Sequence, residues 1–157
     1  MLDSDFLFMR RAIELSLDNV KKGGGPFGAV VVRKGEILAE SCNLVTALND
    51  PTAHAEINVI REAARKLETF DLSGCVIYSS CEPCPMCLGA IYWARIDKVV
   101  FANTRSDAQN IGFADSLIYK EISRPPQERN IVFQQILREE ALKAFKAWEE
   151  SENKVEY

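Results

Sequence analysis

The sequence has little of what marks extended, secreted or membrane-spanning chains. Its 157 residues include only 8 glycines and 6 prolines, spread along the length, with no internal repeat, linker or low-complexity stretch. No apolar run approaches the ~20 residues that cross a bilayer, and the first residues are acidic where a secretory signal would be basic. We therefore expect a single cytoplasmic domain, residues 1–157, with no membrane partner.

Basic residues are also too few and too dispersed for a nucleic-acid surface. The 19 lysines and arginines are outnumbered by 23 aspartates and glutamates, which gives a net charge of −4, and no long basic run occurs. Because phosphate contacts require a basic stripe or patch, this balance disfavours a nucleic-acid partner and favours a small-molecule substrate.

Apolar periodicity predicts the order of the secondary-structure elements. Helices are expected over residues 6–20, 50–67, 85–95, 114–119 and 139–150. Strands are expected over residues 27–33, 36–42, 75–79, 98–103 and 131–136. The first two strands form an antiparallel hairpin around Lys34-Gly35, and the segment 75–103 forms a parallel strand–helix–strand crossover. Together they predict an α/β fold, a three-layer α/β/α sandwich on a mixed five-stranded sheet.

The residues able to bind a metal are concentrated in two short motifs. The only histidine, His54, stands two residues before Glu56, and Cys84 and Cys87 lie in a P-C-x-x-C motif. H-x-E with P-C-x-x-C is the signature of zinc-dependent nucleobase deaminases. Two thiols spaced i, i+3 at the start of a helix can bind one ion, and the helix N-terminus favours the thiolate form. We therefore predict a zinc site formed by His54, Cys84 and Cys87.

Three protein ligands leave a fourth position open to water, which predicts a hydrolytic enzyme. Zinc lowers the pKa of bound water from about 16 to about 7, so hydroxide is available at neutral pH. Zinc-bound hydroxide can attack a ring carbon that carries an exocyclic amine. Glu56 is expected to accept the water proton, deliver it to a ring nitrogen and then protonate the departing ammonia.

The same residues also allow other interpretations. A lone histidine is commonly a hydrogen-bonded core residue. Cys81 and Cys84 form a C-x-x-C of the kind found in thioredoxin-like redox proteins. Cys81 can also act as a fourth ligand and close the site into a structural zinc-binding module without catalysis. Otherwise Cys42, Cys75 and Cys81 are expected to be core residues.

Three stretches around these motifs resemble the bacterial guanine deaminases of the cytidine deaminase-like fold. They are GGPFGAV at 24–30, NDPTAHAE at 49–56 and SCEPCPMCLGAIYWAR at 80–95. The resemblance continues through 112–116 and 118–122 to the terminal Glu156-Tyr157, so it spans essentially the whole chain. It implies hydrolysis of guanine to xanthine and ammonia, by attack of water on C2 of the purine, with one zinc ion per subunit.

The resemblance also implies substrate contacts outside the metal motif. It implies a catalytic role for Asp115, in base binding or at the departing amine. The resemblance also implies that Asn43 and Tyr157 bind the substrate, and we expect Phe27, Ala55 and Trp93 to line the same site, with the two aromatic rings stacked on the base. In such proteins the C-terminal helix and tail, here 138–157, can come from the partner subunit of a homodimer.

Most of these residues also have a purely structural interpretation. Asn43 can close a turn, Asp115 can cap a short helix, and Tyr157 can lie in a frayed chain end. Phe27 and Trp93 can be core aromatic residues. The metal motif is common to the wider superfamily, so deamination of adenosine in tRNA or of cytosine is the alternative function.

Overall fold

The computed structural model describes residues 3–157, which form two compact units. The first unit extends to Asp115, and the second covers Ser116–Tyr157. Both motifs of the predicted metal site belong to the first unit. The architecture of that unit therefore determines how the site is assembled.

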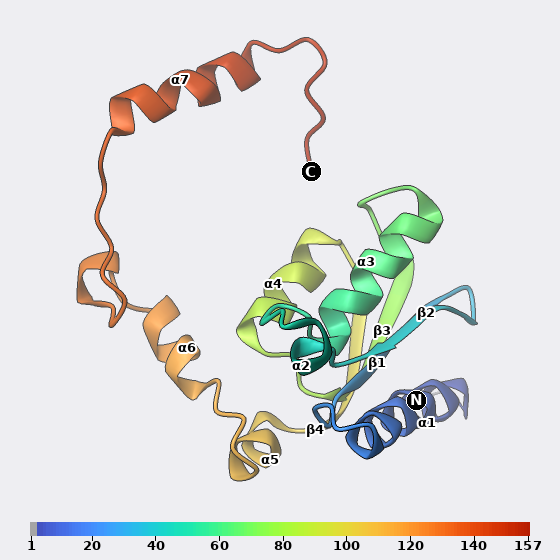
Figure 1. Cartoon of the computed structure of the whole chain (residues 1–157). Coiled ribbons are helices and arrows are strands. Elements are labelled where there is room, and N and C mark those ends of the chain that lie inside the picture. The colour runs from blue at the N-terminus through green and yellow to red at the C-terminus, as the bar shows by residue number, and fades with distance from the viewer. Residues whose placement is uncertain (1–2) are drawn as a thin grey trace. The chain divides into compact units, whose positions relative to one another are not determined.

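A mixed sheet of four strands forms the middle layer of the first unit (Figure 1). In their spatial order the strands are β2 (Glu36–Cys42), β1 (Gly28–Arg33), β3 (Cys75–Cys81) and β4 (Lys98–Asn103). β1 pairs antiparallel with both β2 and β3, whereas β3 and β4 are parallel. The predicted hairpin and the predicted parallel crossover are confirmed.

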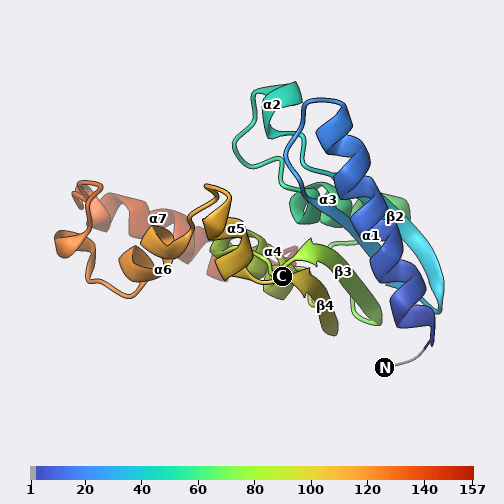
Figure 2. The same cartoon turned by 90° about the horizontal axis from the view of Figure 1, so that it is seen from below.

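Helices cover both faces of this sheet, which Figure 2 views from the side of α1. α1 (Asp3–Lys21) lies on one face, and α3 (Ala55–Leu67) and α4 (Pro85–Trp93) lie on the other. Successive residues of a strand point to opposite faces. Val30 and Tyr78 accordingly share a core with α1, whereas Val31 and Ile77 share a core with α3 and α4. The predicted three-layer α/β/α sandwich is confirmed.

Five further elements complete the described chain. They are α2 (Val45–Leu48), α5 (Arg105–Asn110), α6 (Ser116–Ile122), the 3₁₀ helix η1 (Pro126–Glu128) and α7 (Arg138–Glu149). The sequence pattern did not predict α2 and α5, which are short and contain no buried residue. None of the helices in residues 3–157 combines the length and the apolar character that crossing a membrane requires.

The prediction of a fifth strand over residues 131–136 is wrong. This segment forms no strand in the described chain, and Val132 within it is 90% exposed. Its apolar residues have the composition of a strand, but a strand also needs a second backbone with which to pair. The second unit contains only helices and irregular segments, so the sheet has four strands instead of five.

The predicted start of the second helix is also wrong, because α3 begins at Ala55. The Asp50 carboxylate does not cap this helix. Its Oδ1 accepts hydrogen bonds from the backbone N–H and the hydroxyl of Thr52, at 2.8 and 2.7 Å, and these close a separate turn. The N-cap of α3 is His54 instead. The ends of the other predicted helices and of the first four strands agree with the structure to within about three residues.

A buried carboxylate connects α1 to two strands. Asp5 is almost inaccessible, and its Oδ1 accepts a 2.6 Å hydrogen bond from the hydroxyl of Tyr78 on β3. Its Oδ2 lies 3.3 Å from the ammonium group of Lys98 on β4, whose side chain is half exposed. A hydrogen bond to a buried charged group contributes more to stability than a partly exposed ion pair. Tyr78 should therefore contribute more to the free energy of unfolding than Lys98.

We expect Tyr78→Phe to lower the free energy of unfolding by about 1–3 kcal/mol, because it removes a buried hydrogen bond to a carboxylate. Lys98→Met, which removes the other partner of the same carboxylate, should cost about 1 kcal/mol or less. Urea unfolding of both variants measures the difference. Equal losses in the two variants would contradict the assignment of the larger contribution to Tyr78.

Candidate active site

Three predicted metal ligands come together although they belong to two separate segments of the chain. The Sγ atoms of Cys84 and Cys87 each lie 3.6 Å from Nδ1 of His54. All three ligand atoms lie within 4.8 Å of one another. In the described residues this is a candidate metal site, and it brings together the residues that the sequence motifs predicted.

The starts of two helices create this arrangement. His54 is the N-cap of α3 and Cys84 is the N-cap of α4, and both have extended backbones with ψ of 155° and 169°. Pro85 occupies the first turn of α4, where its missing N–H costs no hydrogen bond. Cys87 follows in the same turn and is buried. The ligands therefore gather at the positive ends of two helix dipoles, which favour thiolates.

The ionisation of the two thiols fits a divalent cation. A hydrogen bond with Cys87, together with His54, lowers the pKa of Cys84 to about 4. The same pairing, together with burial, raises the pKa of Cys87 above its usual range. Two adjacent thiolates repel each other, and a divalent cation removes that repulsion. One imidazole and two thiols form a donor set that suits zinc.

Glu56 lies in the first turn of α3, beside the three candidate ligands His54, Cys84 and Cys87, which we call the metal-site cluster. Glu56 is only 5% exposed, and this burial raises the pKa of its carboxyl group. Its Oε1 accepts a 2.9 Å hydrogen bond from the hydroxyl of Ser79 on β3, and its Oε2 lies 3.5 Å from Sγ of Cys87. The carboxylate therefore stands between the sheet and the candidate metal ligands.

Cys81 does not join the metal-site cluster formed by the described residues. Its Sγ lies 3.6 Å from the carbonyl oxygen of Thr104, and burial raises its pKa to about 11. All five cysteines are free thiols, so Cys81 and Cys84 form no disulfide. The structure gives no support to a fourth ligand at Cys81, and it agrees with the prediction that this residue is buried at a strand end.

Asn43 directly follows β2, and hydrogen bonds to its backbone hold it in place. Its N–H donates to the carbonyl of Phe27, and its own carbonyl accepts a 2.8 Å hydrogen bond from Nδ2 of Asn19. Its Oδ1 accepts a 3.2 Å hydrogen bond from the backbone N–H of Val45. The turn-closing interaction considered for Asn43 is therefore present in the structure.

Two other asparagine amides hold the loops on either side of Asn43. Nδ2 of Asn19 donates to the carbonyl of Gly25 as well as to that of Asn43. Nδ2 of Asn58 donates to the carbonyls of Cys42 and Ala53, at 3.0 and 3.1 Å. Asn58 thereby ties the end of β2 to the residue before His54. These two amides fix the backbone that carries both Asn43 and a metal-ligand candidate.

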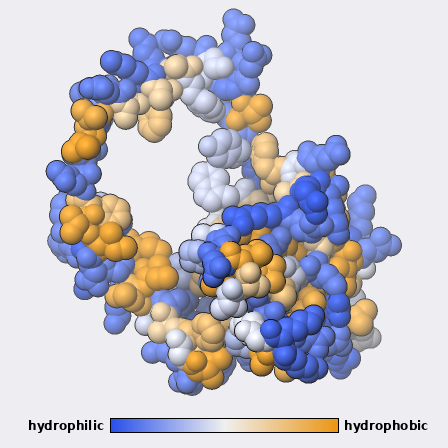
Figure 3. Space-filling model, viewed as in Figure 1, coloured by the Kyte–Doolittle hydropathy of each residue, from blue (hydrophilic) through white to orange (hydrophobic). Residues whose placement is uncertain are grey.

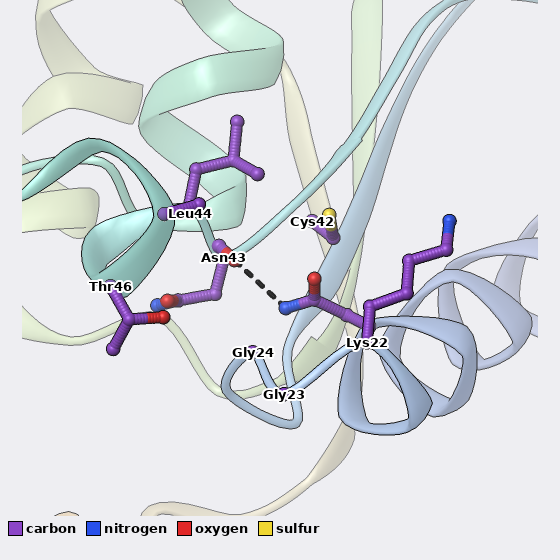
Figure 4. A pocket seen from close by; sticks show the side chains of 9 residues that line it. Lys22, Gly23, Gly24, Cys42, Asn43, Leu44 and Thr46 are labelled. Atoms are coloured by element: carbon purple, nitrogen blue, oxygen red, sulfur yellow. Dashed lines mark hydrogen bonds between the residues drawn. The ribbon is translucent and has the colours of Figure 1, made fainter.

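A pocket of about 330 Å³ lies beside Asn43, between the end of α1 and α2 (Figure 4). Lys22, Gly23, Gly24 and Thr46 are among the residues that line it, and the dashed line in Figure 4 marks the hydrogen bond to the Asn43 carbonyl. Its lining does not include the three candidate metal ligands.

The remaining predicted site residues fall into different environments. Ala55 is fully buried in the core, and Phe27 is half-buried with its ring edge-on to Phe113 at a centroid distance of 4.9 Å. Trp93 ends α4 and is largely exposed. Asp115 is half-buried, and burial, followed by the nearby Cys84, raises its pKa.

Tyr157, the last predicted substrate-binding residue, belongs to the second unit and is 72% exposed. The other predicted site residues all belong to the first unit. The predicted site residues are therefore divided between one residue of the C-terminal tail and a group that belongs to the first unit.

Comparison with known proteins shows which protein family has this arrangement. The family described as the cytidine and deoxycytidylate deaminase zinc-binding region matches residues 2–103, which include every candidate metal ligand. The chain belongs to this family. The match ends with β4, so it covers the helix starts that carry the ligands and leaves the last third of the chain outside it.

Relatives within the deaminase family differ in how much of the chain they match. A guanine deaminase from Bacillus subtilis is 53% identical over 96% of this chain and 97% of its own length. The X-ray structure of guanine deaminase from Bacillus subtilis has a TM-score of 0.95, with 51% identity over 100% of this chain and 99% of that one. A tRNA-specific adenosine deaminase from Aquifex aeolicus is 44% identical over 60% of this chain and 63% of its own length.

Sequence reasoning missed three side chains that support the site of this deaminase-family chain: Ser79, Asn19 and Asn58. Ser79 lies in a strand whose pattern indicates only burial. The asparagines lie inside helices, where a polar residue is commonly assigned to the solvent face. The one available signal was that Asn is unfavourable inside a helix, which suggests that its amide has a specific partner.

We expect Cys87→Ser to lower the zinc bound per chain by about tenfold or more, because it removes a thiolate ligand. Cys81→Ser is the matched control, since Cys81 is also buried and lies six residues earlier, outside the metal-site cluster. Metal analysis after dialysis against a weak chelator measures both. An equal loss of zinc in the Cys81 variant would restore the four-ligand interpretation.

Proposed function

We propose that the chain is a guanine deaminase that hydrolyses guanine to xanthine and ammonia with one zinc ion per subunit. The observation that carries this choice of substrate is the 53% identity with a guanine deaminase over 96% of the chain, well beyond the region that the family shares. The acidic net charge of −4 supports a small base over a polyanionic RNA. Five free thiols are consistent with a reducing compartment such as the cytoplasm.

His54, Cys84 and Cys87 are the proposed zinc ligands, since their donor atoms already lie within 4.8 Å of one another. When bound, zinc supplies a Lewis acid that makes water a stronger nucleophile at neutral pH. The helix starts of α3 and α4 hold the ligands in place without any loop rearrangement within the described structure. The protein side of the proposed reaction then depends on residues next to this cluster.

Glu56 is the proposed proton carrier. Its Oε2 faces Cys87 and hence the metal side of the site. In the proposed reaction Glu56 takes a proton from the attacking water and passes it to a ring nitrogen of guanine. It then takes the second water-derived proton from the new C2 hydroxyl and gives it to the exocyclic amine, so the bond between C2 and that amine breaks, ammonia leaves and a C2 carbonyl remains. The carboxylate is regenerated in the same cycle, and no other reactant is consumed.

Asn43 and Asp115 are proposed to recognise the polar edges of the purine. Support for Asp115 comes from Cys84, which contributes, after burial, to the raised pKa of the Asp115 carboxyl group. Asn43 can recognise a base with its amide N–H groups while its Oδ1 accepts from Val45. A site built on such hydrogen bonds discriminates strongly against bases that lack a partner group.

Three further residues complete the proposed lining of the substrate site: Phe27, Ala55 and Trp93. Phe27 is half-buried and already makes an edge-on contact with Phe113, so one ring face can serve a planar base. Ala55 follows His54 directly and is the first residue of α3. Trp93 is exposed at the end of α4, which agrees with a contact made from outside the core.

The whole chain, 1–157, is proposed to act as one deaminase domain in a homodimer that exchanges residues 138–157, so that Tyr157 completes a site of the partner. Support comes from the second unit, in which no residue is buried. Phe145 and Trp148 of α7 are 75% and 46% exposed, and apolar side chains reach the surface of this unit (Figure 3). An amphipathic helix of this kind needs an apolar surface to cover it.

Purified protein should release ammonia from guanine at least about 100-fold faster than from adenine, cytosine or a tRNA anticodon stem, because the proposed hydrogen bonds match the guanine edge. Ammonia assays with each substrate at equal concentration measure this ratio. A preference for the anticodon stem would move the chain to the tRNA adenosine deaminases, and a preference for cytosine would replace the purine altogether.

Glu56→Gln should lower kcat for guanine by about 10² to 10⁴-fold while the bound zinc is unchanged, because only the proton carrier is lost. The glutamine keeps the size of the side chain and can still hydrogen-bond with Ser79. Kinetic assays and metal analysis on the same sample measure the two quantities. Unchanged turnover would remove Glu56 from the reaction, and absence of turnover in both proteins would favour a structural zinc module.

A chain that ends at Glu156 should have a higher KM for guanine than the full chain, because it lacks Tyr157. Co-expression of this chain with the Glu56→Gln chain distinguishes an exchanged tail from a local one. With exchange, the Glu56→Gln subunit supplies Tyr157 to an intact site of its partner, so random dimers should recover about a quarter of wild-type activity. Activity no greater than the average of the two separate variants would place the tail in its own subunit.

A further inference from the structure

Two adjacent serines of β3 are buried and have different hydrogen-bond partners. Ser79 is 1% exposed and Ser80 is 2% exposed. The hydroxyl of Ser79 donates to Oε1 of Glu56 at 2.9 Å, across the interface between the sheet and α3. The hydroxyl of Ser80 accepts from the backbone N–H of Gly28 at 3.0 Å, within the sheet. Only one of the two serines therefore contacts the proposed proton carrier.

The hydrogen bond from Ser79 determines which carboxylate oxygen of Glu56 faces the metal-site cluster. The last torsion of a glutamate side chain is soft, so the two oxygens can exchange places or tilt unless a partner holds one of them. Ser79 holds Oε1, and Oε2 is left 3.5 Å from Sγ of Cys87. Burial of both residues keeps bulk water from substituting for the hydroxyl.

We propose that Ser79 is a positioning residue for the reaction, which fixes the carboxylate plane of Glu56 so that Oε2 is presented to the metal side of the site. This inference rests on the proposed deamination, in which Glu56 moves protons. In the proposed reaction Glu56 binds neither the substrate nor the metal. Displacement of its carboxylate should therefore slow proton transfer without weakening the binding of guanine. Misplacement of a reacting group by about 1 Å can cost on the order of 100-fold in rate.

We expect Ser79→Ala to lower kcat for guanine by about 10- to 100-fold, with KM within about threefold of wild type and zinc content unchanged. Ser79→Thr and Ser79→Val isolate the hydroxyl, because the two side chains have nearly the same shape. The threonine variant should exceed the valine variant in kcat by about tenfold. A crystal structure of Ser79→Ala should show the Glu56 carboxylate rotated or in two orientations.

Ser80→Ala is the matched control, because it removes one buried hydroxyl from the adjacent position of the same strand. It should lower stability in urea unfolding by an amount similar to Ser79→Ala but keep kcat within about threefold of wild type. A purely structural role for Ser79 predicts that the two alanine variants lose kcat equally.

Different outcomes separate the two hypotheses. If wild-type protein releases no ammonia from guanine, the proposed function fails and the inference about Ser79 fails with it. If wild type is active and threonine and valine at position 79 give equal kcat, the positioning role alone is overturned. If Ser79→Ala does not fold, the threonine and valine pair and the orientation of Glu56 in their crystal structures decide the same point.

Discussion

His54 and Cys84 each occupy an N-cap position, and the rest of the site depends on this constraint. An N-cap residue has an extended backbone, so its side chain leaves the helix at the end where unpaired N–H groups and the positive end of the dipole lie. The side chains at two such helix ends meet, and Cys87 adds a third donor from the first turn of α4. The contacts of Cys84 with Cys87 and His54 in this cluster also lower the pKa of the Cys84 thiol.

The sheet contributes more to this site than a platform for the helices. Glu56 is buried between α3 and β3, and a buried carboxylate is costly without a hydrogen-bond donor. Ser79 supplies that donor from β3, while Asn19 and Asn58 hold the carbonyls of the loops that carry Asn43 and His54. In the described residues no buried side-chain nitrogen or oxygen lacks a partner. The buried polar side chains around the site therefore all have hydrogen-bond partners.

Local chemistry made much of this fold predictable from the sequence. Lys34 and Gly35 have φ of 52° and 82°, as a two-residue hairpin turn requires, and the metal ligands follow from two motifs. Failures arose where a pattern has two outcomes. Asp50 caps a turn as readily as a helix, and the apolar residues at 131–136 form a strand only if another strand lies beside them. The contact between Ser79 and Glu56 could not be predicted, because strand periodicity indicates which face of the sheet a residue occupies but not which side chain of the covering helix it contacts.

The family match and the likeness to a guanine deaminase cover different lengths of the chain. The family match ends at residue 103, and likeness to a tRNA-specific adenosine deaminase covers 60% of the chain, whereas likeness to a guanine deaminase covers 96%. The residues beyond β4, which include the second unit, are therefore shared with a guanine deaminase but lie outside the family match. Because that unit buries none of its own residues, it needs another surface to acquire a fixed shape. If that surface belongs to a partner subunit, recognition of the purine and assembly of the dimer are one physical event.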